Sequence, residues 1–442
     1  MLRAKSVLAL ALAGAAVVAI AHAQRIDPRR GKTIVVGVPP GPAAAERVDA
    51  ARSGQARTPL PAGTLHVAWR RSLGLPIDAP PLVDARGDVT VLTARGDVVV
   101  LAPDGVERSH TAVGTAAATP AALLSDGTAV FLSGQGDAIG VRLASLRFRT
   151  RIGGGRTGVA PLALEDGGFV VAMAGELVAV DGEGGIRARA ALPAGDPPAN
   201  ALLGAAGADG ATVYAVTANG TAWAWVPASG REVRQVGSFG GPADGGAAIA
   251  AGGSVGLLVA VVGSQLLALD PATGILTTRG SAPTSGAVAL LGPPATRGGA
   301  ITVVGVTVTR TLALTFDPSG AELLHQALAP SLLLPLPDGG TGPGQLPAHG
   351  GLGHAGPLVD PQGNVAFALP SGEVGVASAS GAVDVLGDVC TRFNPTSPLA
   401  NLASTRTAAT YAGLLPAAPY ALVLACGSGV VARIDSDFAP SP

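Results

Sequence analysis

From Leu65 onward the chain repeats itself with a period of about 40 residues, and this periodicity constrains the fold more than any other feature. The clearest unit, residues 81–105, contains short runs of alternating β-branched residues bounded by Gly-Asp turns, which is typical of β-hairpins. Residues 357–381 nearly overlay it: both have Leu-Val-Asp followed by two turn glycines. Weaker copies begin near Pro120, Pro161, Ala201, Pro242 and Pro283. Short strands at a constant spacing, without the 3.6-residue period of helices, predict the blades of a β-propeller.

The two ends of the repeat region indicate how the ring closes. After the seventh unit, residues 407–415, 420–426 and 430–434 provide three strands but no fourth. Residues 65–71 precede the first unit, belong to none, and resemble an outermost strand. Pairing them with the last unit would remove both exposed edges. We therefore expect an all-β, eight-bladed propeller closed by the N-terminal strand, with seven blades as the alternative.

The N-terminus has the pattern of an export signal. Arg3 and Lys5 precede an apolar run at residues 6–21, and Ala21-His22-Ala23 places small residues before a cleavage point at Gln24. A membrane anchor is the alternative, but a bilayer span needs roughly 20 apolar residues. We expect residues 1–23 to be a cleaved secretory signal. The mature protein would then be extracytoplasmic, in the periplasm, secreted or on the cell surface, without a transmembrane span.

Composition divides the remainder of the chain into a tether and a propeller. Residues 24–62 are rich in Pro, Ala and Arg, which predicts a flexible tether. Residues 63–442 would form the propeller. A Pro/Gly/Leu-rich insertion at about 329–353 separates the sixth and seventh units, and loops of this length are usually functional or disordered. Its apolar residues and two histidines mark a possible interaction loop: Leu332, Leu333, Leu334, Leu336, His349 and His354.

Charge and cysteine content restrict the partners. Without Arg3 and Lys5 the chain has 27 basic residues against 30 acidic ones, which argues against a nucleic-acid partner. Cys390 and Cys426 are the two cysteines of the chain, and in an oxidising compartment such an isolated pair predicts one disulfide. Two buried thiols are the alternative.

The units resemble the pyrroloquinoline-quinone-like, or quinoprotein-type, propeller repeat, in which each blade carries Ala-x-Asp-x-x-x-Gly-x-x-x-Trp. Residues 268–274 and 179–185 match the first part, but the tryptophan position holds Thr278 and Arg189. Trp69 lies where the family would place that tryptophan. The resemblance covers about residues 65–435. It implies either quinoprotein dehydrogenases, which bind quinone and calcium at the propeller centre, or the non-enzymatic, BamB-like branch of interaction scaffolds.

Each candidate site in the sequence also has a purely structural explanation. Trp223 and Trp225 are two residues apart in one expected strand, so their side chains share a face and would form an aromatic platform, or else pack between blades. The Gly-Asp turns need no bound ion, because Asp and Gly suit hairpin backbone angles. His349 and His354 have no evident third metal ligand. We name no catalytic, cofactor-binding or metal-binding residue and expect no cofactor.

These observations rank three functional hypotheses. The first is a non-catalytic, monomeric scaffold that binds an envelope or outer-membrane protein. The second is a propeller that binds carbohydrate or another small ligand, which the 3% aromatic content disfavours. The third is a quinone-dependent dehydrogenase, disfavoured by the lack of adjacent cysteines and by the eroded tryptophan positions.

Overall fold

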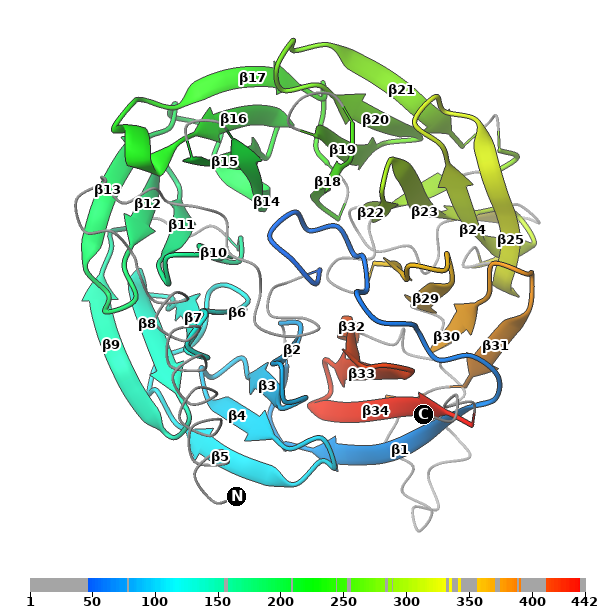
Figure 1. The fold of residues 1–442 in the computed structure, drawn as a ribbon, viewed down its shortest axis with the longest axis horizontal. Helices are drawn as coiled ribbons and strands as arrows, with labels where there is room; N and C mark the ends of the chain where they lie inside the picture. Colours follow the sequence, from blue (N-terminus) through cyan, green and yellow to red (C-terminus); the bar gives the residue numbers. More distant parts are fainter. Residues whose placement is uncertain are drawn as a thin grey trace, which may run out of the picture. The chain divides into compact units, whose positions relative to one another are not determined.

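Eight four-stranded antiparallel sheets follow one another around a ring, which is the eight-bladed propeller that the repeat predicts (Figure 1). The computed structural model describes residues 47–77, 79–154, 158–207, 210–243, 245–252, 256–282, 285–287, 289–330, 334–335, 341–342, 356–369, 374–387, 389–390 and 411–437. The predicted signal peptide lies outside these residues. Among them, no helix has the length and apolar character that a membrane span requires.

Within each blade the strands follow one another from the inside of the ring to the outside (Figure 1). Blade 1 consists of β2 (Leu82–Val83), β3 (Val89–Leu92), β4 (Val98–Leu101) and β5 (Glu107–Thr111). Blade 2 consists of β6 (Ala122–Leu123), β7 (Ala129–Leu132), β8 (Asp137–Arg142) and β9 (Ser145–Arg151). Blade 3 consists of β10 (Leu162–Ala163), β11 (Phe169–Met173), β12 (Glu176–Val180) and β13 (Ile186–Ala191). Blade 4 consists of β14 (Pro198–Gly207), β15 (Gly210–Thr217), β16 (Thr221–Trp225) and β17 (Arg234–Ser238), with a 3-10 turn at Pro227–Ser229.

The remaining blades have the same order until the ring closes. Blade 5 consists of β18 (Ala247–Ala250), β19 (Leu257–Val262), β20 (Gln265–Leu269) and β21 (Leu276–Ser281). Blade 6 consists of β22 (Ala289–Arg297), β23 (Ala300–Val306), β24 (Arg310–Phe316) and β25 (Glu322–Pro330). A separate hairpin, β26 (Leu334–Pro335) with β27 (Thr341–Gly342), follows. Blade 7 consists of β28 (Leu358–Val359), β29 (Val365–Ala368), β30 (Val374–Ala377) and β31 (Val383–Leu386).

Blade 8 combines the two ends of the propeller, as the sequence predicts. It contains β32 (Tyr411–Ala418), β33 (Ala421–Cys426), β34 (Val430–Ser436) and, outermost, β1 (Leu65–Ser72). The antiparallel register runs from Leu65 opposite Ser436 to Ser72 opposite Val430. The choice of eight blades over seven, and of closure by the N-terminal strand, is thereby confirmed.

Burial explains why the inner and outer strands differ in sequence. The second and third strands of blade 1 read VTVL and VVVL, and all eight residues are buried. Both faces of these strands are covered, so apolar residues replace the alternation of a half-exposed sheet. The outer strands are largely exposed and carry polar side chains, as in the ERSHT of β5. Turn glycines such as Gly87 and Gly96 have φ of 80° and 86°, a conformation that costs glycine little.

Neighbouring blades adhere through apolar layers and through contacts at the turns of the outer strands. The Phe148 ring of blade 2 stacks on Phe169 of blade 3, with centroids 6.0 Å apart. Trp69 of blade 8 packs over Gly105 of blade 1, where an added Cβ would approach the indole to 2.8 Å. The indole Nε1 also donates a hydrogen bond of 2.7 Å to the carbonyl of Pro103. Trp69 therefore joins the last blade to the first.

The predicted tether boundary is wrong for residues 47–62. Val48, Ala56 and Leu60 are buried at 1%, 0% and 1% exposure, and the stretch hydrogen-bonds to several blades. Its Pro/Ala/Arg composition resembles a linker, but the side chains lie against the inner strands instead of in solvent. Residues 24–46 lie outside the described residues.

We expect Trp69→Ala to destabilise the propeller by about 2–4 kcal/mol, because it removes a partly buried indole from the joint between blades 8 and 1. Trp69→Phe should cost less, about 1 kcal/mol, since the ring remains and only the bond to Pro103 is lost. Urea unfolding of both variants measures this. Equal stability of Trp69→Ala and the parent chain would contradict the assigned role of the joint.

Candidate functional site

The centre of the ring, where the quinoprotein resemblance would place a cofactor, contains a stretch of the chain itself. Residues 47–60, called here the central segment, are drawn in dark blue inside the ring (Figure 1). Its backbone bonds to successive blades in order. The carbonyls of Ala50, Ala51 and Ser53 accept hydrogen bonds from three backbone amides, those of Gly204 in blade 4, Ile249 in blade 5 and Thr296 in blade 6. The segment thus follows the inner strands around the ring.

The second half of the central segment continues this path to blades 7 and 8. Gln55 forms a parallel bridge with Val359, and Ala56 donates a hydrogen bond of 2.8 Å to the Val359 carbonyl. The Leu60 amide donates to Asp360 Oδ2 at 3.0 Å. Asp360 is the aspartate of the Leu-Val-Asp repeat in blade 7 and is fully buried. The Pro59 carbonyl then accepts a bond from the Tyr420 amide in blade 8.

Two buried arginines hold the first half of the central segment. Arg47 donates to the carbonyls of Pro357 and Pro294, each at 2.8 Å. Arg52 donates to the carbonyls of Leu202, Ala160 and Pro161 at 3.2–3.3 Å. A guanidinium presents five N–H donors in a fixed fork, so one side chain can bind carbonyls from two neighbouring blades. The segment is therefore anchored to blades 3, 4, 6 and 7 by side chains as well as by backbone.

The aspartates of the repeat turns are fully explained by hydrogen bonding within the turns. In blade 3, Asp181 Oδ1 accepts bonds from the amides of Glu183 and Gly185. In blade 6, Asp317 Oδ1 accepts from the Ser319 hydroxyl and from the Ala321 amide, and these bonds lower the pKa of Asp317 below its usual range. Bonds of this kind satisfy the carboxylate without a cation. Within the described ranges, no group of three His, Cys, Asp or Glu side chains is arranged to hold a metal ion.

The predicted aromatic platform is wrong, because Trp223 and Trp225 pack against a neighbouring blade. Trp225 is 2% exposed within the apolar layer between blades 3 and 4, together with Leu177 and Leu202. Trp223 is partly buried against the same layer. A ring covered in this way offers no face on which a ligand could stack. The alternative interpretation, packing between blades, describes both residues.

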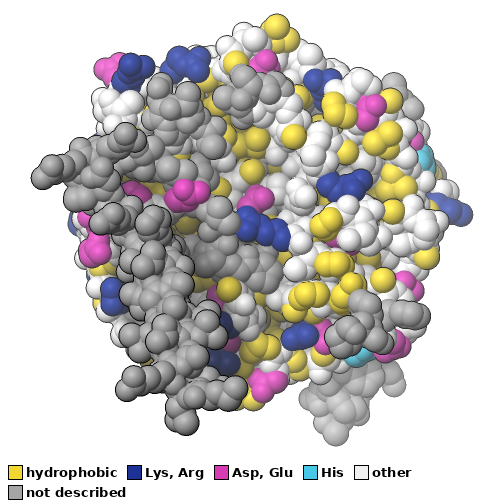
Figure 2. All heavy atoms as spheres, viewed as in Figure 1, with side chains coloured by type: hydrophobic (Ala, Val, Ile, Leu, Met, Phe, Trp, Pro, Cys, Tyr) yellow, Lys and Arg dark blue, Asp and Glu magenta, His cyan; other side chains and the backbone are white. Residues whose placement is uncertain are grey.

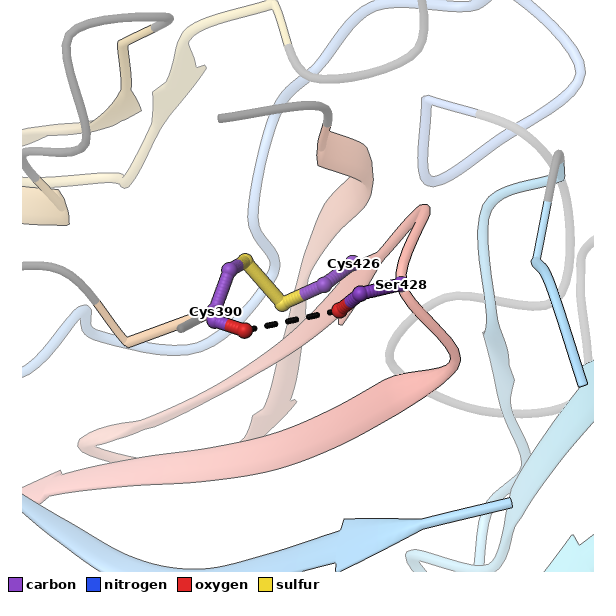
Figure 3. The surroundings of a disulfide bond; sticks show 3 residues. All are labelled: Cys390, Cys426 and Ser428. Carbon is purple, nitrogen blue, oxygen red and sulfur yellow. Dashed lines mark hydrogen bonds between the residues drawn. A yellow bond between two sulfur atoms is a disulfide. The ribbon is translucent and has the colours of Figure 1, made fainter. Parts of the chain in front are cut away.

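The two cysteines are bonded to each other. Cys390 follows the last strand of blade 7, Cys426 ends β33 of blade 8, and a disulfide joins them across 36 residues of sequence. The Ser428 hydroxyl donates a hydrogen bond of 3.4 Å to the Cys390 carbonyl (Figure 3). Cys426 is completely buried and Cys390 is 7% exposed. The bond therefore staples blade 7 to blade 8 beside the closure of the ring.

Most of the predicted interaction loop lies outside the described residues. This applies to Leu332, Leu333, Leu336, His349 and His354. Leu334 begins β26, whose partner is β27, and this hairpin belongs to none of the eight blades. The insertion thus follows β25 and precedes β28, at the place in the chain where the repeat spacing predicts it.

A cavity that the sequence did not reveal lies between blades 1 and 2. Its volume is about 250 Å³, and its lining includes Asp84, Arg86, Asp126, Arg142 and Leu143. Arg86 contacts Asp84 at 3.0 Å, and Arg142 contacts Asp126 at 3.5 Å. The cavity is therefore lined by ion pairs of both signs. No local motif signals it, because its residues come from turns of two different repeats.

A buried carboxylate lies next to this cavity. Asp88 has a side chain that is 3% exposed, with Arg108 at 3.1 Å and Arg86 at 3.3 Å. Burial, and next the nearby Asp84 carboxylate, raise the pKa of Asp88, while the two arginines oppose the shift.

On the visible face of the molecule, outside the parts drawn in grey, acidic and basic side chains are interspersed with apolar ones (Figure 2).

Comparisons with known proteins identify the fold class. No family model and no curated protein matches the chain. Among solved structures, BamB from Moraxella catarrhalis superposes with a TM-score of 0.57 at 16% identity, covering 86% of this chain and 100% of that one. The quinohemoprotein alcohol dehydrogenase ADHIIG from Pseudomonas putida HK5 gives 0.62 at 11% identity, covering 91% and 82%. The corresponding enzyme from Comamonas testosteroni gives 0.59 at 11% identity, covering 90% and 81%.

These similarities show that the chain shares the propeller fold of BamB and of the two quinohemoprotein dehydrogenases. They confirm the resemblance drawn from the repeats at the level of the fold. Since one of these proteins is BamB and two are alcohol dehydrogenases, the shared fold is compatible with both branches.

We expect the double substitution Cys390→Ala with Cys426→Ala to lower the free energy of unfolding by about 2–4 kcal/mol, as is typical of a lost disulfide. The thiols are buried, so substitution is a cleaner test than added reductant. Thermal unfolding of the variant and the parent measures the change. Identical melting curves for the variant and the parent would show that the Cys390–Cys426 disulfide does not stabilise the propeller.

We expect Arg52→Met to destabilise the protein by about 1–3 kcal/mol, because three buried carbonyls lose a charged donor. Arg57→Met, at an exposed position of the same segment, is the matched control and should change stability by less than about 0.5 kcal/mol. Urea unfolding compares the two. Similar effects of both substitutions would show that Arg52 does not anchor the segment.

Proposed function

We propose that this protein is a non-catalytic, extracytoplasmic scaffold that binds another protein of the cell envelope. The observation that carries the proposal is the central segment. In this chain the centre of the ring holds residues 47–60, fixed by backbone bonds to blades 4 to 8 and by two buried arginines. A quinone at the same place would have to displace them.

Two further observations support a binding function over a dehydrogenase. Trp225 is buried between blades, so it is not available to stack on a quinone. The cysteines are 36 residues apart in sequence and link two blades, whereas in several quinoprotein dehydrogenases a disulfide of adjacent cysteines lies beside the quinone. The extracytoplasmic location rests on the signal-like residues 1–23 and on the disulfide, which oxidising compartments favour.

A direct test is titration of the purified protein with pyrroloquinoline quinone and calcium, followed by tryptophan fluorescence and by dye-linked alcohol oxidation. A quinohemoprotein dehydrogenase serves as the positive control. We expect neither quenching nor turnover for this protein. Stoichiometric quinone binding with alcohol-dependent dye reduction would overturn the scaffold and establish the enzyme.

The partner can be identified by crosslinking the protein in intact envelopes of the source cells. We expect one envelope protein to be captured repeatedly, and capture to fall when residues 331–353 are deleted. This deletion removes the β26–β27 hairpin and leaves all eight blades intact. Capture that is unchanged by the deletion would move the contact to another face of the propeller, and no capture at all would argue against a scaffold.

A further inference from the structure

The hairpin of β8 and β9 in blade 2 differs in charge from the corresponding hairpins of blades 1, 3, 5 and 6. Across β8 and β9, residues 137–151, the chain has four arginines and one acidic residue, Asp137. The corresponding turns of blades 1, 3, 5 and 6 each contain an aspartate: Asp104, Asp181, Asp270 and Asp317. In blade 2 the corresponding turn consists of Leu143 and Ala144 and contains no aspartate. The β8–β9 hairpin therefore has a formal charge of +3, from four arginines and one aspartate, in a protein whose formal net charge is −1.

The tip of this hairpin is apolar and exposed. Arg142 pairs with Ser145, so Leu143 and Ala144 form a two-residue loop. Leu143 is 60% exposed, and Leu146 at the start of β9 is 49% exposed. Two large aliphatic side chains thus project from the outer part of blade 2, next to arginines.

The backbone at Leu143 adds an independent observation. Its φ is 51°, a left-handed conformation that favours Gly or Asn in a two-residue hairpin loop. Among the described residues, four other non-glycine residues have positive φ: Arg47, Val48, Arg52 and Tyr420. These lie in the central segment or bond to it, so contacts in the ring account for them. The Leu143 carbonyl accepts a hydrogen bond from Thr111 Oγ1 of blade 1. Its side chain is nevertheless 60% exposed, and an exposed leucine in a conformationally costly backbone points to a function outside the fold.

Two of the four arginines in the hairpin form ion pairs with aspartates. Arg142 contacts Asp126 and Arg151 contacts Asp137, at 3.5 Å and 3.3 Å. Arg149 donates to the Val113 carbonyl, which leaves its charge without an acidic partner among the described residues. Arg147 is exposed, one position after Leu146. The uncompensated charge of the hairpin therefore lies on Arg147 and Arg149, which follow Leu146 in β9.

We propose that this hairpin, residues 142–151, docks on the surface of an anionic lipid bilayer. Leu143 and Leu146 would enter the interface while Arg147 and Arg149 bind the headgroup phosphates. Apolar side chains flanked by arginine are the combination that peripheral lipid binding requires, because burial and attraction act together. A soluble polyanion would use the arginines but gain nothing from the leucines.

The experiment is sedimentation of the protein, as isolated after export, with vesicles of phosphatidylcholine containing about one third phosphatidylglycerol. We expect binding to these vesicles, weaker binding at high salt, and little binding to pure phosphatidylcholine. Arg147→Glu with Arg149→Glu should weaken partitioning by at least about tenfold, since each basic residue near an anionic leaflet contributes about fivefold. The matched control is Arg231→Glu with Arg234→Glu in and before β17 of blade 4, which are also exposed.

A second pair of variants tests whether the exposed Leu143 side chain contributes to vesicle binding. Leu143→Gly suits the positive φ, so it should leave stability unchanged or raised while it weakens vesicle binding several-fold. Ile275→Ser, directly before β21 of blade 5, is at a position with the same 60% exposure and should not affect binding. A loss of folding is thereby separated from a loss of binding.

Three results would overturn the proposal. The first is no preference for anionic vesicles. The second is an equal effect of the blade 2 variants and their controls. The third is full binding by Leu143→Gly together with displacement by soluble polyphosphate, which would indicate a polyanion site instead. None of these outcomes bears on capture of an envelope protein, so this inference and the proposed function fail independently.

Discussion

Every blade of this protein depends on its neighbours to cover the two faces of its sheet. The inner strands are apolar on both faces, as in the fully buried VTVL and VVVL of blade 1. Such a sheet cannot be stable alone in water, because about half of its apolar side chains would be exposed on each face. The ring satisfies this requirement only when it is closed. The pairing of β1 with β34, the Trp69 joint and the Cys390–Cys426 bond all lie around that closure.

The same constraint explains why so few aromatic residues suffice. Val, Ala and Leu fill the layers between blades, and close approach is achieved with glycine. A Cβ on Gly280 of blade 5 would collide with Phe316 of blade 6, and within blade 2 one on Gly140 would collide with Phe148. The ring is therefore closed even though Thr278 and Arg189 occupy the tryptophan position of the repeat. Smaller residues, together with arginines that donate to turn carbonyls, such as Arg297 to Pro361, take over the contacts between blades.

The sequence predicted the blades well and the centre poorly. Repeats are local, so Leu-Val-Asp and the turn glycines predict strands and blade number without knowledge of distant contacts. The central segment has no such signal: its partners are 108 to 361 residues away, from Arg52 with Ala160 to Pro59 with Tyr420, and its Pro, Ala and Arg are equally typical of a linker. The cationic hairpin of blade 2 was hidden for a different reason, since a net charge near zero over the whole chain conceals a local run of arginines. Trp223 and Trp225 share a strand as expected, but which face meets a neighbouring blade is decided by the ring.

The central segment also imposes an order on assembly. It is among the first parts of the folded domain to leave the ribosome, yet its partners in blades 7 and 8 are among the last. Arg47 and Pro357 are 310 residues apart, and contacts of such separation form late and slowly. The segment and β1 are joined by only a few residues, so the position of one restricts the position of the other. Folding of this propeller is consequently completed only after nearly the whole chain is available, and until then its apolar blade faces need protection from aggregation.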